Sequence, residues 1–123
     1  MLILVADDDA DVRELVVFRL EHAGYEVISA RDGEEAVALA LERTPDLCVI
    51  DVMMPKLDGL EVTERLRSTP ELAATPILLL TASAHDSAVQ RGMDVGADDY
   101  IAKPFGADDF LARCAAALNS RPR

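Results

Sequence analysis

The sequence predicts a doubly wound α/β fold, in which five parallel strands form one sheet with helices on both faces. Two observations support this class: short apolar runs recur along the chain, and segments with helical periodicity separate them. Such a strict alternation implies parallel strands joined by right-handed crossovers. The chain has 123 residues, half of them hydrophobic, which fits a single domain with its own core.

The five apolar runs are the predicted strands. Several of them carry apolar residues at consecutive positions, a pattern that is typical of strands buried on both faces of a sheet. We expect the strands at residues 2–6, 25–29, 47–50, 77–80 and 100–102.

The first two segments between these runs are predicted to be helices. Apolar residues recur at helical spacing in the first one, which closes at Gly24. The second is expected to start at Asp32, which can cap it, and to end before Pro45. The apolar faces consist of Val12, Leu15, Val16 and Leu20 in the first helix, and of Ala36, Val37, Ala40 and Leu41 in the second.

The remaining three segments also show helix signals. Asp58 can cap a third helix, which ends before Pro70. A fourth helix terminates around Gly96, and a fifth runs from about Ala107. Their apolar positions are Leu60 and Leu66 in the third helix, Ala88, Val89 and Met93 in the fourth, and Phe110, Cys114 and Leu118 in the fifth.

The charge and cysteine content exclude several classes of function. The formal net charge of −11 argues against direct binding of nucleic acid by this domain, since such binding needs clustered Lys and Arg. Cys48 and Cys114 lie in apolar stretches without metal-ligand spacing, so we expect buried free thiols. No apolar run is long enough for a signal peptide or a membrane span, and the cytoplasm is therefore the expected compartment.

Acidic residues follow the first and third predicted strands. Asp7, Asp8 and Asp9 come directly after the first, and Asp51 comes directly after the third. Ligands of open α/β sheets bind at this carboxyl edge. If the two strands are neighbours, about 4.8 Å apart, carboxylates from both can share one cation, and magnesium suits such ligands. Without a cation, this crowding would raise at least one carboxyl pKa.

Capping of the next helix is the alternative explanation for these aspartates. For Asp9 it is as good an explanation as a metal site. For Asp51 it is a poor one, because the plausible cap of the following helix, Asp58, lies further along the chain. Asp51 is therefore the stronger candidate for chemistry.

Polar residues also follow the fourth and fifth predicted strands. Thr81 comes directly after the fourth, and the next residue, Ala82, has a backbone N–H that an anion could approach. Lys103 and Pro104 follow the fifth. Each feature is ordinary by itself, since Thr is common in strands. Together with the acids, they predict one polar site at the carboxyl edge of the sheet.

Four motifs occur in order on the predicted strands: LILVADDD, VIDVMMPKLDG, LLLTA and GADDYIAKPF. They resemble the successive signatures of the receiver domains of two-component response regulators, including the chemotaxis receivers. The resemblance covers essentially the whole chain. It implies a flavodoxin-like strand order of 2-1-3-4-5 in a three-layer sandwich, with a receiver domain at 1–119 and a tail or the start of a linker at 120–123.

By this resemblance, Asp51 is the phosphoacceptor. Its carboxylate attacks the phosphoryl group of a phosphohistidine on a sensor histidine kinase or a histidine phosphotransfer protein. Asp8 binds Mg²⁺, or Mn²⁺, directly, and Asp7 does so at least partly through water. Asp51 and the backbone carbonyl of Met53 complete the ligands that the protein supplies.

The resemblance also implies which residues surround the phosphoryl oxygens. Lys103 supplies positive charge, while Thr81 and the N–H of Ala82 hold the remaining oxygens. The peptide bond before Pro104 is expected to be cis, a form that only about one X–Pro bond in twenty adopts.

A conformational switch is the further implication. Thr81 moves toward the phosphoryl group, Tyr100 turns inward, and the surface of the fourth helix, fifth strand and fifth helix changes. From its position alone, Tyr100 would be read as a half-buried strand aromatic. The charges of that surface resemble the set by which receivers of DNA-binding regulators form homodimers, although exposed pairs contribute only ~0 to 1 kcal/mol each. The set is Arg91, Asp98, Asp99, Asp109 and Arg113.

Two rival functions remain open from the sequence. Phosphatases that form an aspartyl phosphate need a second acid two residues after the nucleophile, where this chain has Met53. The second rival is a receiver-like interaction module that does not switch by phosphorylation. The presence of the full set of site residues speaks against this function. The side chains of Met53 and Ser83 are expected to influence the lifetime of the phosphoryl group, and His85 is expected to be exposed.

Overall fold

Five parallel strands form one sheet in the computed structural model, which describes residues 1–82 and 87–120. Their order is β2-β1-β3-β4-β5, which confirms the predicted topology. Ser83 and His85, as well as residues 121–123 of the expected tail, lie outside the described residues. The strands are β1 (Leu2–Ala6), β2 (Glu26–Ala30), β3 (Leu47–Asp51), β4 (Ile77–Thr81) and β5 (Asp99–Ala102).

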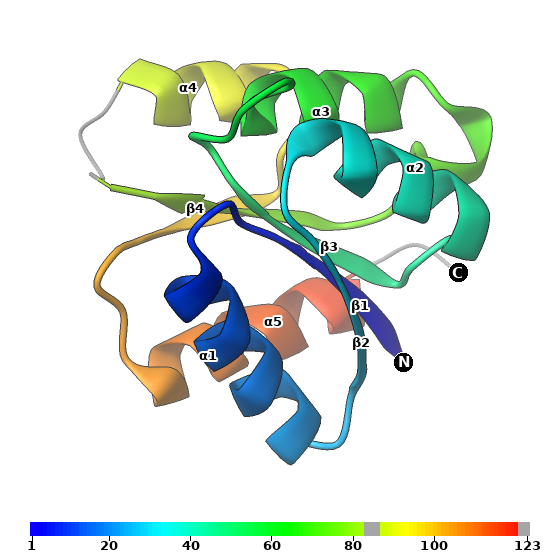
Figure 1. Cartoon of the computed structure of the whole chain (residues 1–123). Helices are drawn as coiled ribbons and strands as arrows, with labels where there is room; N and C mark the ends of the chain where they lie inside the picture. The colour runs from blue at the N-terminus through cyan, green and yellow to red at the C-terminus, as the bar shows by residue number, and fades with distance from the viewer. Residues whose placement is uncertain (83–86, 121–123) are drawn as a thin grey trace.

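Helices cover both faces of the sheet (Figure 1). One face carries α1 (Ala10–His22) and α5 (Ala107–Ser120), and the other carries α2 (Gly33–Arg43), α3 (Gly59–Arg67) and α4 (Ser87–Asp94). A short 3-10 helix, η1 (Pro70–Leu72), lies between α3 and β4. Within the described ranges, none of the helices combines the length and the apolar character that crossing a membrane requires.

The central strands are buried on both faces, as the consecutive apolar positions predicted. In β1, Ile3 and Val5 belong to the core cluster under α1 and α5, whereas Leu4 and Ala6 belong to the cluster on the opposite face. All four residues are fully buried. Because both faces of the sheet are sealed, polar side chains from the central strands can reach solvent only near the strand ends.

Several strand limits differ by one residue from the predicted ranges. β2 begins at Glu26 and ends at Ala30, and β5 begins at Asp99, because these residues pair with Leu2, Ala6 and Leu78 on the neighbouring strands. Hydropathy alone does not detect this pairing, since it depends on the register of the backbone. For the same reason, β3 and β4 extend by one residue and include Asp51 and Thr81.

Aspartates cap the first three helices. The side chain of Asp9 accepts hydrogen bonds from backbone N–H groups in the first turn of α1. Asp32 caps α2, and Asp58 forms a reciprocal capping box with Glu61 at the start of α3. The predicted caps are thus confirmed, and the capping explanation is correct for Asp9.

Arg67 joins the C-terminal end of α3 to the segments that enter β4 and β5. Its guanidinium donates to the carbonyl oxygens of Gly96 at 2.9 Å and Thr75 at 2.7 Å, and it pairs with Asp98 at 2.8 Å. Asp98 also accepts a hydrogen bond from the N–H of Ile77. Asp98 therefore has partners within the chain, although its side chain is 49% exposed.

The two cysteines are both buried and unpaired, as predicted. Burial raises the pKa of the Cys48 thiol and that of the Cys114 thiol to about 12. Both groups are therefore protonated at neutral pH and act as small apolar side chains.

The start of α2 packs directly against the loop between β3 and α3. Gly33 is buried there, and a Cβ added to it would overlap the carbonyl oxygen of Leu57. Lys56 of the same loop has a φ of 71° and pairs with Asp32 at 3.7 Å. The loop that follows Asp51 is thus backed by a helix start that leaves no room for a side chain.

Gly33→Ala should lower the free energy of unfolding by about 2 to 3 kcal/mol, because the added methyl meets backbone atoms that cannot rotate away. Gly106→Ala is the matched control, since a Cβ at Gly106 meets no atom within 4 Å, and it should cost about 1 kcal/mol or less. Urea denaturation measures both values. Equal small losses in the two variants would contradict the close contact between α2 and this loop.

Candidate functional site

Three carboxylates meet at the carboxyl edge of the sheet. Ala6 of β1 pairs with Ile50 of β3, so the residues that follow, Asp7 and Asp51, lie next to each other. One oxygen from each of Asp7, Asp8 and Asp51 lies within 4.8 Å of the others. Asp7 is fully buried and Asp51 is 6% exposed, whereas Asp8 is open to solvent. The structure therefore brings together the acids that the sequence singled out.

Lys103 extends into the same cluster from the end of β5. Its Nζ lies 3.1 Å from Asp7 Oδ2 and 3.3 Å from Asp51 Oδ1. Its backbone N–H donates to the carbonyl oxygen of Thr81 at 2.7 Å, which ties the residue to the neighbouring strand. The peptide bond between Lys103 and Pro104 is cis. One ammonium group thus serves two carboxylates.

Every polar group of Asp7 has a partner within the chain. Its N–H donates to Ala30 O at 3.2 Å, and its two carboxylate oxygens accept from the N–H of Asp9 and from Lys103. Its carbonyl oxygen accepts from Arg13 Nη1 at 2.8 Å. We did not predict the contact of Arg13. The signal that could have found it is a basic residue one helical turn after an acidic run.

The electrostatics of the cluster are strained without a further cation. Burial, and then the charge of Asp7, raise the pKa of Asp51 to about 7, although Lys103 acts in the opposite direction. Burial lowers the pKa of Lys103, but the charges of Asp51 and Asp7 outweigh it and leave that pKa above its usual value. The site therefore has more negative than positive charge, with hard oxygen donors. A divalent cation such as Mg²⁺ fits this donor set.

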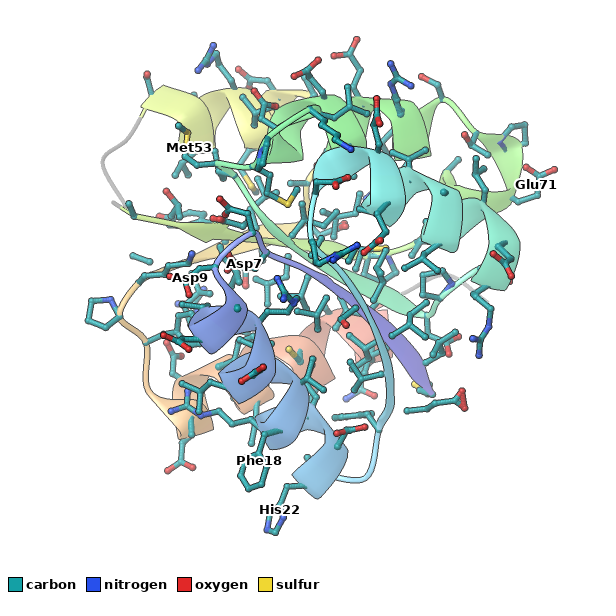
Figure 2. All side chains as sticks on the ribbon, in the orientation of Figure 1. Asp7, Asp9, Phe18, His22, Met53 and Glu71 are labelled. Carbon is teal, nitrogen blue, oxygen red and sulfur yellow. The ribbon has the colours of Figure 1, made fainter. Side chains whose placement is uncertain are left out.

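The loop after Asp51 is held close to the strand end. The N–H of Gly59 donates to Val52 O at 2.8 Å, and a Cβ at Gly59 would lie 2.5 Å from Asp51 O. Met53, in this loop, has a side chain that is 70% exposed. Figure 2 shows it at the same edge of the sheet as Asp7 and Asp9. The α3 start thus fixes the backbone on which Met53 lies.

The other predicted site residues lie at or directly after the end of β4 and within β5. Thr81 is 1% exposed and pairs with Ala102, while Ala82, the next residue, is exposed at the carboxyl edge. Tyr100 is half-buried against the core cluster on the α2–α4 face, and its carbonyl oxygen accepts from Arg113. In this structure Tyr100 therefore has the position of a strand aromatic that is packed on one side.

A groove of about 390 Å³ lies between α1 and the segment after β5, next to the acidic cluster. Two apolar side chains of α1 are unusually exposed, Leu15 at 46% and Phe18 at 64%. Figure 2 shows Phe18 and His22 projecting from α1 away from the sheet. The groove is lined by Val12, Leu15, Arg19, Ala82, Lys103, Pro104 and Phe105.

Residues 3–115 match the model of the family described as the response regulator receiver domain. Among curated proteins, the DNA-binding dual master transcriptional regulator RpaA of Synechocystis is 45% identical over 121 residues, which cover 98% of this chain and 50% of the relative. The chain spans about half the length of the curated relatives it matches.

Solved structures of receiver proteins have the same fold. The chemotaxis protein CheY4 of Vibrio cholerae superposes with a TM-score of 0.89 at 35% identity, covering 94% of this chain and 97% of that one. The receiver domain of the sensor histidine kinase PA1611 of Pseudomonas aeruginosa gives 0.91 at 28% identity, covering 97% and 98%. The latter is described with a magnesium ion coordinated in its active-site cleft.

Asp51 should make stability depend on pH in magnesium-free solution. An unfolded aspartate titrates near pH 4, whereas the folded-state pKa of Asp51 is about 7. The folded state binds this proton more tightly, so the protein loses stability as the pH rises through that window. Asp51→Asn abolishes the loss and should be more stable than the wild type by on the order of 2 kcal/mol near pH 8, with no gain near pH 4.

Chemical denaturation in EDTA at the two pH values measures this difference. A stability difference between Asp51→Asn and wild type that is the same at both pH values would show that the Asp51 carboxyl group is not strained by its surroundings.

Proposed function

The chain belongs to the response regulator receiver family, and we propose that it is a phosphorylation-controlled switch that accepts a phosphoryl group on Asp51. One observation carries this proposal: the Asp51 carboxylate is almost buried at the sheet edge, between Asp7, Asp8 and the Lys103 ammonium. A structural carboxylate would be expected to have its charge balanced locally, whereas here the pKa of Asp51 is raised. The site instead suits the approach of a phosphoryl group together with a cation.

The proposed reaction is a phosphoryl transfer from a histidine. A carboxylate oxygen of Asp51 attacks the phosphorus of a phosphohistidine, the new O–P bond forms as the P–N bond breaks, and the electron pair returns to the imidazole nitrogen. The product is an acyl phosphate. Lys103, 3.3 Å from Asp51, stabilises the negative charge on the transferred group.

When bound, Mg²⁺ or Mn²⁺ would supply positive charge that offsets the repulsion between the phosphoryl oxygens and the carboxylates. We propose that Asp8 binds it directly, that Asp7 contributes at least partly through water, and that Asp51 and the Met53 carbonyl complete the set. The full partnering of Asp7 within the chain supports its indirect role.

We propose that Thr81 and the N–H of Ala82 hold the remaining phosphoryl oxygens. We also propose that Thr81 transmits the effect of phosphorylation to the α4–β5–α5 surface. Thr81 is at the end of β4, and Tyr100 lies on the adjacent strand, half-buried against the α2–α4 face. A shift of Thr81 toward the phosphoryl group would leave space behind it, and an inward turn of Tyr100 would fill this space. The α4–β5–α5 surface then differs between the two states.

We also propose that this surface supports a homodimer of the phosphorylated protein. Arg113 pairs at 3.1 Å with Asp99 and at 3.3 Å with Asp109, within one chain. These exposed pairs contribute little to stability, so exchange for equivalent pairs between two copies costs little. A net charge of −11 favours control of an output by protein contacts over direct nucleic-acid binding by this domain.

The partner that delivers the phosphoryl group is proposed to be a sensor histidine kinase or a histidine phosphotransfer protein in the cytoplasm. It would dock on α1, where Leu15 lines the groove beside the site and Phe18 exposes further apolar surface toward the C-terminal end of the helix (Figure 2). Arg19 lines the same groove, and its Nη1 is buried without a partner among the described residues. The Arg19 guanidinium also gives this groove a positive charge that an acidic side chain of the partner would complement. The domain acts on its own phosphoryl group and is not an enzyme with external turnover.

Incubation with acetyl phosphate or phosphoramidate tests the chemistry directly. Intact mass should show one added phosphoryl group on the wild type with magnesium and none in EDTA. Asp51→Ala should show none under either condition, whereas Asp108→Asn, which changes an acid in the first turn of α5, should behave as the wild type. A folded, magnesium-loaded wild type that stays unmodified would favour the interaction module that does not switch.

Leu15→Glu should separate partner docking from chemistry. We expect at least about tenfold slower transfer from a phosphohistidine donor, because a buried contact becomes charged, with unchanged phosphorylation by acetyl phosphate. Leu41→Glu, at a residue of α2 that is 51% exposed, is the matched control and should leave both rates intact. Equal slowing of both reactions by Leu15→Glu would contradict a docking role for α1.

A further inference from the structure

We propose that Arg13 is a positioning residue of the cation site, a role that rests on the function proposed above. Arg13 lies in the first turns of α1, and its Nη1 donates to the Asp7 carbonyl oxygen at 2.8 Å. That carbonyl belongs to the peptide group that joins Asp7 to Asp8. The hydrogen bond therefore fixes the orientation of the backbone from which the Asp8 side chain extends.

Asp8 depends on its backbone more than Asp7 does. The Asp7 carboxylate is held by the N–H of Asp9 and by Lys103, and it is completely buried. Asp8 is exposed, and its carboxylate makes no hydrogen bond or ion pair with any other described residue. Its oxygen nevertheless lies within 4.8 Å of those of Asp7 and Asp51. A fixed peptide is the structural feature that keeps it there.

The start of α1 holds Arg13 in place for this contact. Asp9 caps the helix, and its carbonyl oxygen accepts from the Arg13 N–H at 2.9 Å. The N–H of Asp9 binds Asp7 Oδ1 at 3.0 Å. Hydrogen bonds thus link Asp7 to Asp9 and Asp9 to Arg13, and the Arg13 guanidinium donates back to the carbonyl oxygen of Asp7.

Because Arg13 is positively charged, the direction in which Mg²⁺ affinity changes when Arg13 is removed tests the proposal. A guanidinium beside the site repels a divalent cation, so its removal should strengthen Mg²⁺ binding if charge is its only influence. If Arg13 positions the Asp7–Asp8 peptide, its removal should weaken binding, because the ordering of Asp8 then has to be completed when the ion binds. The two roles predict opposite changes in affinity.

The experiment is calorimetric titration of Mg²⁺ into wild type, Arg13→Met, Arg13→Lys and Arg65→Met. We expect Mg²⁺ to bind Arg13→Met about tenfold more weakly than wild type. Arg13→Lys keeps the positive charge on a shorter side chain. Its affinity for Mg²⁺ should lie between the affinities of wild type and Arg13→Met. Arg65, an exposed residue of α3, is the control for charge removal. The Mg²⁺ affinity of Arg65→Met should stay within about twofold of the wild-type value, because solvent and salt screen the charge of Arg65 from the site.

Thermal unfolding and the Asp8 amide resonance show whether each variant is folded and whether the peptide has moved. Mg²⁺ binding to Arg13→Met that is as tight as or tighter than to wild type overturns the positioning role. If Arg13→Met does not fold, Arg13→Lys decides, and an affinity equal to that of wild type overturns the role. Absence of binding to the wild type itself overturns the proposed function, which is a different result.

Discussion

Two carboxylates held side by side, and almost out of solvent, are the feature on which the site depends. Asp7 and Asp51 follow paired residues of neighbouring parallel strands, so the register of the sheet brings them together. Burial and the charge of Asp7 oppose the ionisation of Asp51, and Lys103 offsets this only in part. The burial of apolar side chains on both faces of the sheet offsets the free-energy cost of holding these two carboxylates together.

The elements around the cluster restrict its backbone. At the start of α1, the Asp9 cap and Arg13 hold the Asp7–Asp8 segment. At the start of α2, Gly33 lets the helix press against the loop after β3. The carboxyl edge is therefore preorganised where a cation and a phosphoryl group are proposed to bind.

Much of this arrangement could be predicted from the sequence, because it depends on local patterns. Apolar runs marked the strands, and the aspartates at strand ends marked the acidic cluster. The contact of Arg13 was missed although a basic residue one helical turn after the acidic run offers a weak local signal for it. The contacts of Arg67 have no such signal, because they go to backbone carbonyls of segments that meet only after folding. The engagement of Asp98 by Arg67 was missed for the same reason.

The most direct test of the central claim is to identify the residue that carries the phosphoryl group. Reduction of the phosphorylated wild type with borohydride converts an aspartyl phosphate to homoserine, and tandem mass spectrometry of the peptides locates it. Homoserine at position 51 alone is the expected result. Homoserine at position 7 or 8, or its absence from a sample that has taken up phosphate, would contradict Asp51 as the phosphoacceptor.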